Sequence, residues 1–152
     1  MEKPVYGGSS PPGSNMKLVS ACLAGLNVRY DGKSKANEKI IRLVREGKAI
    51  PVCPEQLAGF STPREPMEIR NGRVFTKSGK DVTEQMQKGA EETLKIARLV
   101  NATEIIFKSK SPSCGKGLVY DGSFSGKLAK GNGIATELLE KNGFRVVAEQ
   151  EI

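Results

Sequence analysis

Short apolar runs alternate with longer amphipathic stretches along most of this chain. Three runs, at residues 17–21, 49–52 and 104–107, are rich in the Val, Ile and Ala that fill buried parallel strands. A fourth run, at 144–147, follows the last amphipathic stretch. Because the runs alternate with amphipathic stretches, the pattern predicts an α/β fold with a Rossmann-like open sheet that is mainly parallel.

Three amphipathic stretches separate the apolar runs and predict helices. They span residues 37–47, 81–101 and 133–143. Asn37 is placed to cap the first, and Asp81 or Thr83 to begin the longest. Glycine or asparagine at the far end of each stretch suits the left-handed residue that commonly ends a helix.

A small hairpin and a long loop complete the expected fold. Asn71-Gly72 lies between two short runs at 67–70 and 73–76, and a tight hairpin turn needs positive φ at both central positions. This pattern predicts a hairpin inserted between strand and helix. The glycine-rich segment 109–133 is expected to be a loop.

The chain length of 152 residues suits one domain with one core. Residues 1–15 are dense in Gly, Ser and Pro and are followed by a second methionine, Met16, so we expect a disordered leader or expression tag there. The folded domain is expected at 16–152. No apolar stretch approaches the roughly 20 residues that span a bilayer, and the start lacks a signal-peptide core, so we expect a cytoplasmic protein without a membrane partner.

The chain carries 24 Lys and Arg against 17 Asp and Glu, a net charge of +7, and no histidine. Such a charge favours polyanions, phosphorylated substrates or an anionic cofactor as partners. A basic surface with no specific partner accounts for the charge equally well.

The only cysteines, Cys22, Cys53 and Cys114, each come after one of the first three apolar runs. The ends of parallel strands meet at one edge of a sheet, so the three thiols are expected to lie together. An odd number of widely spaced cysteines is a poor disulfide framework. Thiolate favours zinc, copper(I) or an iron-sulfur cluster, and three ligands leave a fourth position open. Three small buried hydrophobes are the alternative interpretation.

Polar side chains accompany two of these cysteines. Glu55 follows Cys53 after a single proline, which restricts the backbone and holds a proton-transfer group near a ligand. Ser111 and Ser113 flank a proline beside Cys114, where their hydroxyls can donate hydrogen bonds to a substrate or a cluster. Cations lie near these segments in the sequence and would offset an anionic cluster: Arg29, Arg64, Lys108, Lys110 and Lys116.

Taken together and in order, these segments make the chain resemble the thiouracil desulfurase family over nearly all of residues 16–147. The motifs that carry the resemblance are Val19-Ser20-Ala21-Cys22-Leu23, Val28-Arg29-Tyr30-Asp31-Gly32, Pro51-Val52-Cys53-Pro54-Glu55, Pro63-Arg64, Gly79-Lys80-Asp81-Val82-Thr83, Ser111-Pro112-Ser113-Cys114-Gly115 and Tyr120-Asp121-Gly122.

The resemblance implies a 4Fe-4S cluster bound by Cys22, Cys53 and Cys114, with one iron open to the sulfur of a thiolated uracil. It also implies that Glu55 and Ser111 assist proton transfer. The expected reaction is a non-redox desulfuration in which Glu55 activates water, and the products are uracil and hydrogen sulfide.

The expected substrate is 2-thiouracil or 4-thiouracil, as the free base or as a nucleotide. The amides that begin the helix at 133–143 are expected to hold a phosphate if the substrate is a nucleotide, with Lys127 and Lys130 nearby. The sequence does not indicate an oligomeric state.

Two other functions are compatible with parts of the sequence. Cys53-Pro54-Glu55 has the ligand-x-Glu arrangement of a zinc-dependent deaminase or hydrolase, but the second Pro-Cys-x-x-Cys element of such enzymes is absent from the sequence. The charge of +7 suits a basic nucleic-acid-binding module with a structural metal site. The scarcity of aromatic residues argues against a nucleic-acid partner, because no basic and aromatic stacking strip accompanies the charge.

Overall fold

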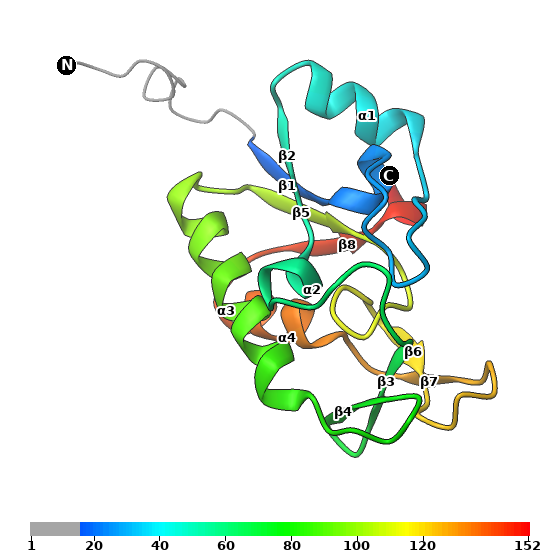
Figure 1. Ribbon diagram of the computed structural model, residues 1–152. Helices are drawn as coiled ribbons and strands as arrows, with labels where there is room; N and C mark the ends of the chain where they lie inside the picture. Colours follow the sequence, from blue (N-terminus) through cyan, green and yellow to red (C-terminus); the bar gives the residue numbers. More distant parts are fainter. Residues whose placement is uncertain (1–15) are drawn as a thin grey trace.

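The computed structural model describes residues 16–152, and the segment expected to be a leader or tag, residues 1–15, lies outside the described residues. Four parallel strands form the central sheet in the order β2-β1-β5-β8 (Figure 1). They are β1 (Lys17–Ser20), β2 (Ala49–Val52), β5 (Glu104–Phe107) and β8 (Val146–Ala148). The predicted α/β fold with a mainly parallel sheet is confirmed.

Helices cover both faces of this sheet (Figure 1). Successive residues of a strand point to opposite faces, so each strand contributes to two cores. Leu18 packs in a cluster with residues of α3 (Thr83–Leu99) and α4 (Ile134–Lys141). Val19 belongs to a second cluster with residues of α1 (Glu38–Arg45). The runs were apolar throughout because both faces are buried.

The helix ends agree with most of the capping predictions. The Asn37 side-chain oxygen accepts hydrogen bonds from the amides of Lys39 at 3.0 Å and Ile40 at 3.3 Å, so Asn37 caps α1 as predicted. Of the two candidate starts of the longest helix, Thr83 is its first residue. The Asp81 carboxylate accepts from the amide of Thr83 at 3.0 Å and so satisfies one of the donors at the helix start.

The predicted hairpin is present as β3 (Met67–Arg70) and β4 (Arg73–Thr76). Its turn residues Asn71 and Gly72 have φ of 51° and 76°. The hairpin packs on the start of α3 through a small apolar cluster of Met67, Val74, Val82 and Met86.

The glycine-rich segment was predicted to be a loop, and this was wrong in part. It contains a second antiparallel ribbon, β6 (Leu118–Tyr120) and β7 (Leu128–Lys130). Both strands are short and mostly exposed, so they carry little of the alternation that marks a half-buried strand. A short helix, α2 (Pro54–Leu57), was also not predicted.

The last strand begins two residues later than the apolar run suggested. The amide of Phe144 donates to the carbonyl of Leu139 and so belongs to the end of α4. Its side chain packs against the core cluster under α3 and α4. Within residues 16–152, no helix is long and apolar enough to cross a bilayer.

Candidate active site

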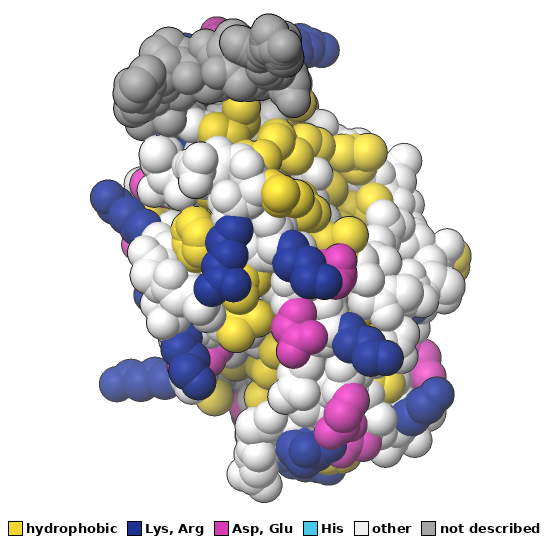
Figure 2. All heavy atoms as spheres, turned by 90° about the vertical axis from the view of Figure 1, so that its left-hand side faces the viewer, with side chains coloured by type: hydrophobic (Ala, Val, Ile, Leu, Met, Phe, Trp, Pro, Cys, Tyr) yellow, Lys and Arg dark blue, Asp and Glu magenta, His cyan; other side chains and the backbone are white. Residues whose placement is uncertain are grey.

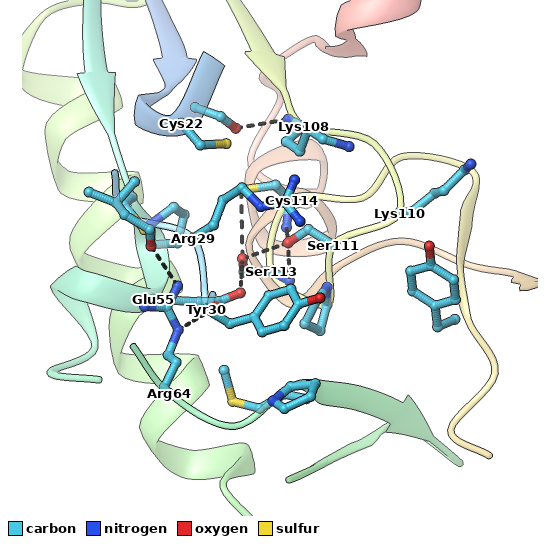
Figure 3. A pocket seen from close by; sticks show the side chains of 18 of the residues that line it. Cys22, Arg29, Tyr30, Glu55, Arg64, Lys108, Lys110, Ser111, Ser113 and Cys114 are labelled. Carbon is cyan, nitrogen blue, oxygen red and sulfur yellow. Dashed lines mark hydrogen bonds and ion pairs between the residues drawn. The ribbon is translucent and has the colours of Figure 1, made fainter. Parts of the chain in front are cut away.

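A cavity of about 600 Å³ opens at the carboxyl ends of β1, β2 and β5. It is lined by every residue that the sequence singled out as a ligand or a proton-transfer group: Cys22, Cys53, Glu55, Ser111 and Cys114. Figure 3 shows four of them, Cys22, Glu55, Ser111 and Cys114. These residues follow strands that are far apart in the sequence, and they meet in the cavity because parallel strands end at the same edge of the sheet.

Three different local structures carry the cysteines. Cys22 lies in a single 3₁₀ turn, η2 (Ala21–Ala24), directly after β1. Cys53 immediately precedes α2, where Pro54 at the first helical position suits the helix start. Cys114 lies in the loop that follows β5, and its amide donates to the hydroxyl oxygen of Ser111 at 3.0 Å.

The start of α4 anchors the Cys114 loop. The amide of Ile134 donates to the carbonyl of Pro112 at 2.8 Å, and the amide of Ala135 donates to that of Ser113 at 2.9 Å. Gly133 allows this approach, because a Cβ there would lie 2.4 Å from the carbonyl carbon of Ser113. These amides are therefore already used, and the expectation that they hold a substrate phosphate is wrong.

Burial raises the pKa of all three thiols in the cluster-free chain. It is the largest cause of a rise in the Cys22 pKa to about 11, and the nearby Cys53 adds to that rise. Burial likewise raises the pKa of Cys53, and the pKa of Cys114 most of all, since Cys114 is fully enclosed. Cys53 also raises the pKa of Cys22, and both of them raise the pKa of Cys114.

Two hydroxyl groups face the sulfur of Cys114. The Ser113 oxygen lies 3.6 Å from this sulfur, and the hydroxyls of Ser113 and Ser20 partly offset the rise in the Cys114 pKa. The Ser20 oxygen also accepts the amide of Lys108 at 2.8 Å, which ties the ends of β1 and β5 together. Such donors stabilise a thiolate in an apolar site.

Glu55 is buried and fully paired (Figure 3). One carboxylate oxygen accepts from Nε of Arg64 at 2.7 Å, and the other accepts from the hydroxyl of Ser113 at 2.9 Å. The Arg64 guanidinium is held in turn by the carbonyl of Val28 at 2.9 Å. A buried carboxylate needs such partners, because an unpaired charge there would be costly.

The two serines of the Cys114 loop form a chain that ends at Glu55. The Ser111 oxygen accepts from the amides of Ser113 at 3.1 Å and Cys114 at 3.0 Å, which fills both of its lone pairs. Its own proton is therefore left to donate to the Ser113 hydroxyl, 3.0 Å away. Ser113 then donates to Glu55, so a continuous path of hydrogen bonds joins the carboxylate to Ser111.

Four of the five cations noted in the sequence line the cavity, namely Arg29, Arg64, Lys108 and Lys110. Lys108 and Arg29 lower the pKa of Cys22 and so oppose the effect of burial. Lys116 was expected beside the cysteines, but it pairs with Glu140 of α4 and does not line the cavity. The prediction for Lys116 rested on its closeness to Cys114 in the sequence, and it was wrong because the chain turns away from the cavity after Cys114.

Sequence reasoning did not identify three of the polar partners. Arg64 was noted only as a nearby cation, although it is the ion-pair partner of Glu55. Ser113 was noted only as a possible donor, and its place between Ser111 and Glu55 depends on the fold. Ser20 carried no signal beyond its closeness to Cys22.

The donor set of the cavity fits an iron-sulfur cluster. It has three thiols, cations nearby and a serine hydroxyl 3.6 Å from one sulfur, and thiolates bind clusters readily. Within residues 16–152, no three Cys, Asp or Glu side chains converge closely enough to hold a single metal ion.

Comparisons with known proteins give the same assignment as the sequence motifs. The family model described as 2-thiouracil desulfurase matches residues 18–151. The uncharacterized protein YbbK of Bacillus subtilis (strain 168) is 48% identical over 147 residues, which cover 90% of this chain and 97% of YbbK. The solved structure of the 4Fe-4S-dependent thiouracil desulfidase TudS superposes with a TM-score of 0.87 at 40% identity, covering 91% of this chain and 93% of that one. The chain belongs to the 2-thiouracil desulfurase family.

Proposed function

We propose that this protein is an iron-sulfur-dependent enzyme that removes the sulfur of a thiolated uracil by hydrolysis, without net oxidation or reduction. Thiouracil and water give uracil and hydrogen sulfide. The observation that carries the proposal is the cavity in which Cys22, Cys53 and Cys114 meet Glu55 and Ser111, in a chain 40% identical to TudS.

Cys22, Cys53 and Cys114 are the residues that would hold the 4Fe-4S cluster. Thiolates that line one cavity suit a cluster, in which each thiolate binds a different iron. With three cysteines as its protein ligands, a bound cluster would supply Lewis-acid chemistry toward the substrate sulfur.

Glu55 is the proposed base. It takes one proton from the water that adds to the ring carbon bearing the sulfur, and Arg64 stabilises its charged form before that step. When the carbon–sulfur bond breaks, its electron pair leaves with the sulfur, and the water oxygen loses its remaining proton and becomes the new carbonyl oxygen. The sulfur takes up that proton and the one that Glu55 removed, so it leaves as hydrogen sulfide.

Ser113 and Ser111 are proposed to return this proton to the reacting group. Once Glu55 is protonated it donates to Ser113, and the Ser111 hydroxyl turns from Ser113 toward the reacting group and gives up its proton. Ser113 then passes its own proton to Ser111. Each hydroxyl gains one proton and gives one, so the number of protons is unchanged. Ser111 is the member of this path that faces the substrate.

The form of the substrate is open between the free base and a nucleotide. A phosphate cannot use the first amides of α4, which hold the Cys114 loop. Lys35, Lys77 and Lys110 line the cavity and make no ion pair with a described residue, so they are the cations that a phosphate would meet. If they bind one, the catalytic efficiency for a thiouridine monophosphate should exceed that for the free base, and this advantage should shrink as salt is added.

The two alternative functions receive less support. A mononuclear zinc hydrolase needs ligands that converge on one ion, and no such group is found among the described residues. A nucleic-acid-binding module needs a continuous basic surface. On the α3 side of the molecule, Lys and Arg are interspersed with Asp and Glu (Figure 2).

The test begins with anaerobic purification and cluster reconstitution, followed by absorption spectroscopy and analysis of iron and acid-labile sulfide. The holoenzyme is then given 2-thiouracil, 4-thiouracil and their nucleoside monophosphates at low and high salt. We expect sulfide and uracil to appear in equal amounts. A chain that binds zinc, or a 4Fe-4S protein that releases no sulfide from any of these compounds, would contradict the proposal.

A further inference from the structure

The segment that joins β6 to β7 places an aromatic residue in the cavity wall. Phe124 and Gly126 both line the cavity. Phe124 has a φ of 55°, in the left-handed region that a bulky side chain rarely adopts. Such conformations persist where the surrounding structure enforces them, and they are concentrated at ligand-binding sites.

Glu68 enforces this conformation. It is a buried carboxylate of β3, and one of its oxygens accepts the amides of both Gly122 and Phe124 at 3.0 Å. Gly122 permits the contact, because a Cβ there would lie 2.6 Å from the Cβ of Arg70. The Asp121 carboxylate accepts the amide of Ser123 at 2.9 Å and closes the turn between them.

Core packing does not explain the arrangement. None of the three apolar clusters formed by the described residues includes Phe124. Phe124 is only partly buried, and it lines the same cavity as the cysteines. A strained aromatic residue that adds nothing to a core, held by a buried carboxylate, indicates that the position of the ring matters for a ligand.

We propose that Phe124 is the surface on which the planar pyrimidine ring of the substrate stacks, and that Glu68 is the residue that positions it. This inference rests on the proposed function and adds the base-binding subsite to it. A flat heteroaromatic ring gains from stacking on an aromatic face, whichever atoms its edge carries. Phe124 would therefore bind 2-thiouracil and 4-thiouracil alike and would not select between them.

Two other aromatic residues line the cavity, Tyr30 and Tyr120. Tyr30 is 41% exposed and stacks with Arg29, whose guanidinium lies 5.7 Å from its ring centre. Neither tyrosine has the left-handed backbone of Phe124 or a buried carboxylate bonded to its amide. Phe124 is thus the aromatic residue whose placement the fold enforces.

The test uses reconstituted holoenzyme and two readouts: steady-state kinetics with 4-thiouracil, and the affinity for the product uracil by calorimetry. Phe124→Leu keeps an apolar side chain but removes the aromatic face, so we expect KM and the uracil Kd to rise roughly tenfold while kcat changes little. Phe124→Tyr keeps the face and should restore both values.

Two further variants separate binding from folding. Phe124→Gly removes the strain as well as the ring, so it should lose uracil affinity as Phe124→Leu does, without a lower thermal midpoint than Phe124→Ala. Glu68→Ala should raise KM in the same direction. Glu65→Ala is its matched control, because Glu65 also accepts a backbone amide, that of Ser78 at 2.8 Å, but does not line the cavity.

The outcomes distinguish this inference from the proposed function. An active wild-type enzyme in which Phe124→Leu leaves KM and uracil affinity unchanged would overturn the stacking surface alone. An effect of Glu65→Ala equal to that of Glu68→Ala would overturn the positioning role. A wild-type holoenzyme that acts on no thiouracil would refute the proposed function, and the assignment of a pyrimidine to Phe124 with it.

Discussion

The sheet face under α3 and α4 and the wall of the cavity are both buried, but they are buried with opposite kinds of side chain. The first is filled by Leu18, Ile105 and Phe107, which are 0% exposed and apolar. The second contains Glu55 at 7% exposure and Ser113 at 2%. The two regions adjoin at the carboxyl ends of the same strands.

This contrast separates the buried residues that stabilise the fold from the buried residues that are proposed to take part in the reaction. Apolar packing is the main favourable contribution to folding. Buried carboxylates and hydroxyls need partners merely to offset the loss of water, so apolar residues of similar shape would often stabilise the same space better. Substitutions in the first region should therefore lower stability, whereas substitutions in the second should lower activity more than stability.

The largest effect is expected at the cysteines. Replacing Cys22, Cys53 or Cys114 by Ser should abolish retention of the proposed cluster, because each is proposed to supply one thiolate and the sequence contains no fourth cysteine. Iron and sulfide analysis after anaerobic gel filtration measures this. A variant that keeps a full cluster and activity would remove that cysteine from the site.

Substitutions in the apolar core under α3 and α4 should lower the stability of the fold. Leu139→Ala empties a fully buried position between α4 and the sheet and should lower the free energy of unfolding by about 2–5 kcal/mol. Leu99→Ala, at a position 81% exposed, is the control and should change it by less than about 0.5 kcal/mol. Urea titration measures both, and folded Leu139→Ala should keep its turnover number. A loss of turnover in folded Leu139→Ala would contradict the expected separation of stability from activity.

Glu55→Gln should show the reverse pattern. It keeps an oxygen to accept from Arg64 but removes the base, so turnover should fall at least about a hundredfold while cluster content stays unchanged. Sulfide release from a thiouracil measures turnover. Glu91→Gln, on the exposed side of α3, is the control. Near-normal turnover in Glu55→Gln would show that another group activates water.

The smallest effect is expected at the two serines. Ser111→Ala and Ser113→Ala each interrupt the path from Glu55, so each should lower turnover roughly tenfold. If the two hydroxyls act as one unit, the double variant should be no slower than the slower single variant. Multiplied effects in the double variant would indicate that the serines act separately.

The sequence predicted the parts of the fold that have a strong local signal. The fully buried strands were apolar on both faces. Asn37 has a side-chain oxygen that can accept the first amides of a helix, and Asn71-Gly72 can adopt the positive φ angles of a tight turn. The ribbon of β6 and β7 was missed because its strands are only three residues long and largely exposed. Its position depends on a hydrogen bond from the Gly122 amide to Glu68, which is far away in the sequence. Such a contact leaves no periodic pattern in the sequence.

The same distinction applies to the candidate site. Cysteines stand out by their rarity, and Glu55 by its closeness to Cys53, so both could be proposed from the sequence. Arg64 and Ser113 become informative only when the fold brings them to Glu55. The predicted phosphate site on α4 was wrong because the free amides at a helix start can donate to backbone carbonyls of the same chain as well as to an anion.

That use of the α4 amides bears on how the cofactor is acquired. The loop that carries Cys114 is fixed by bonds from Ile134 and Ala135 that need no cluster. The conformational entropy of ordering this loop is therefore lost when the chain folds and does not weaken cofactor binding. In this respect the protein differs from a zinc finger, which folds only around its metal. We therefore expect the Cys114 part of the proposed cluster site to form as the chain folds, before any cofactor binds.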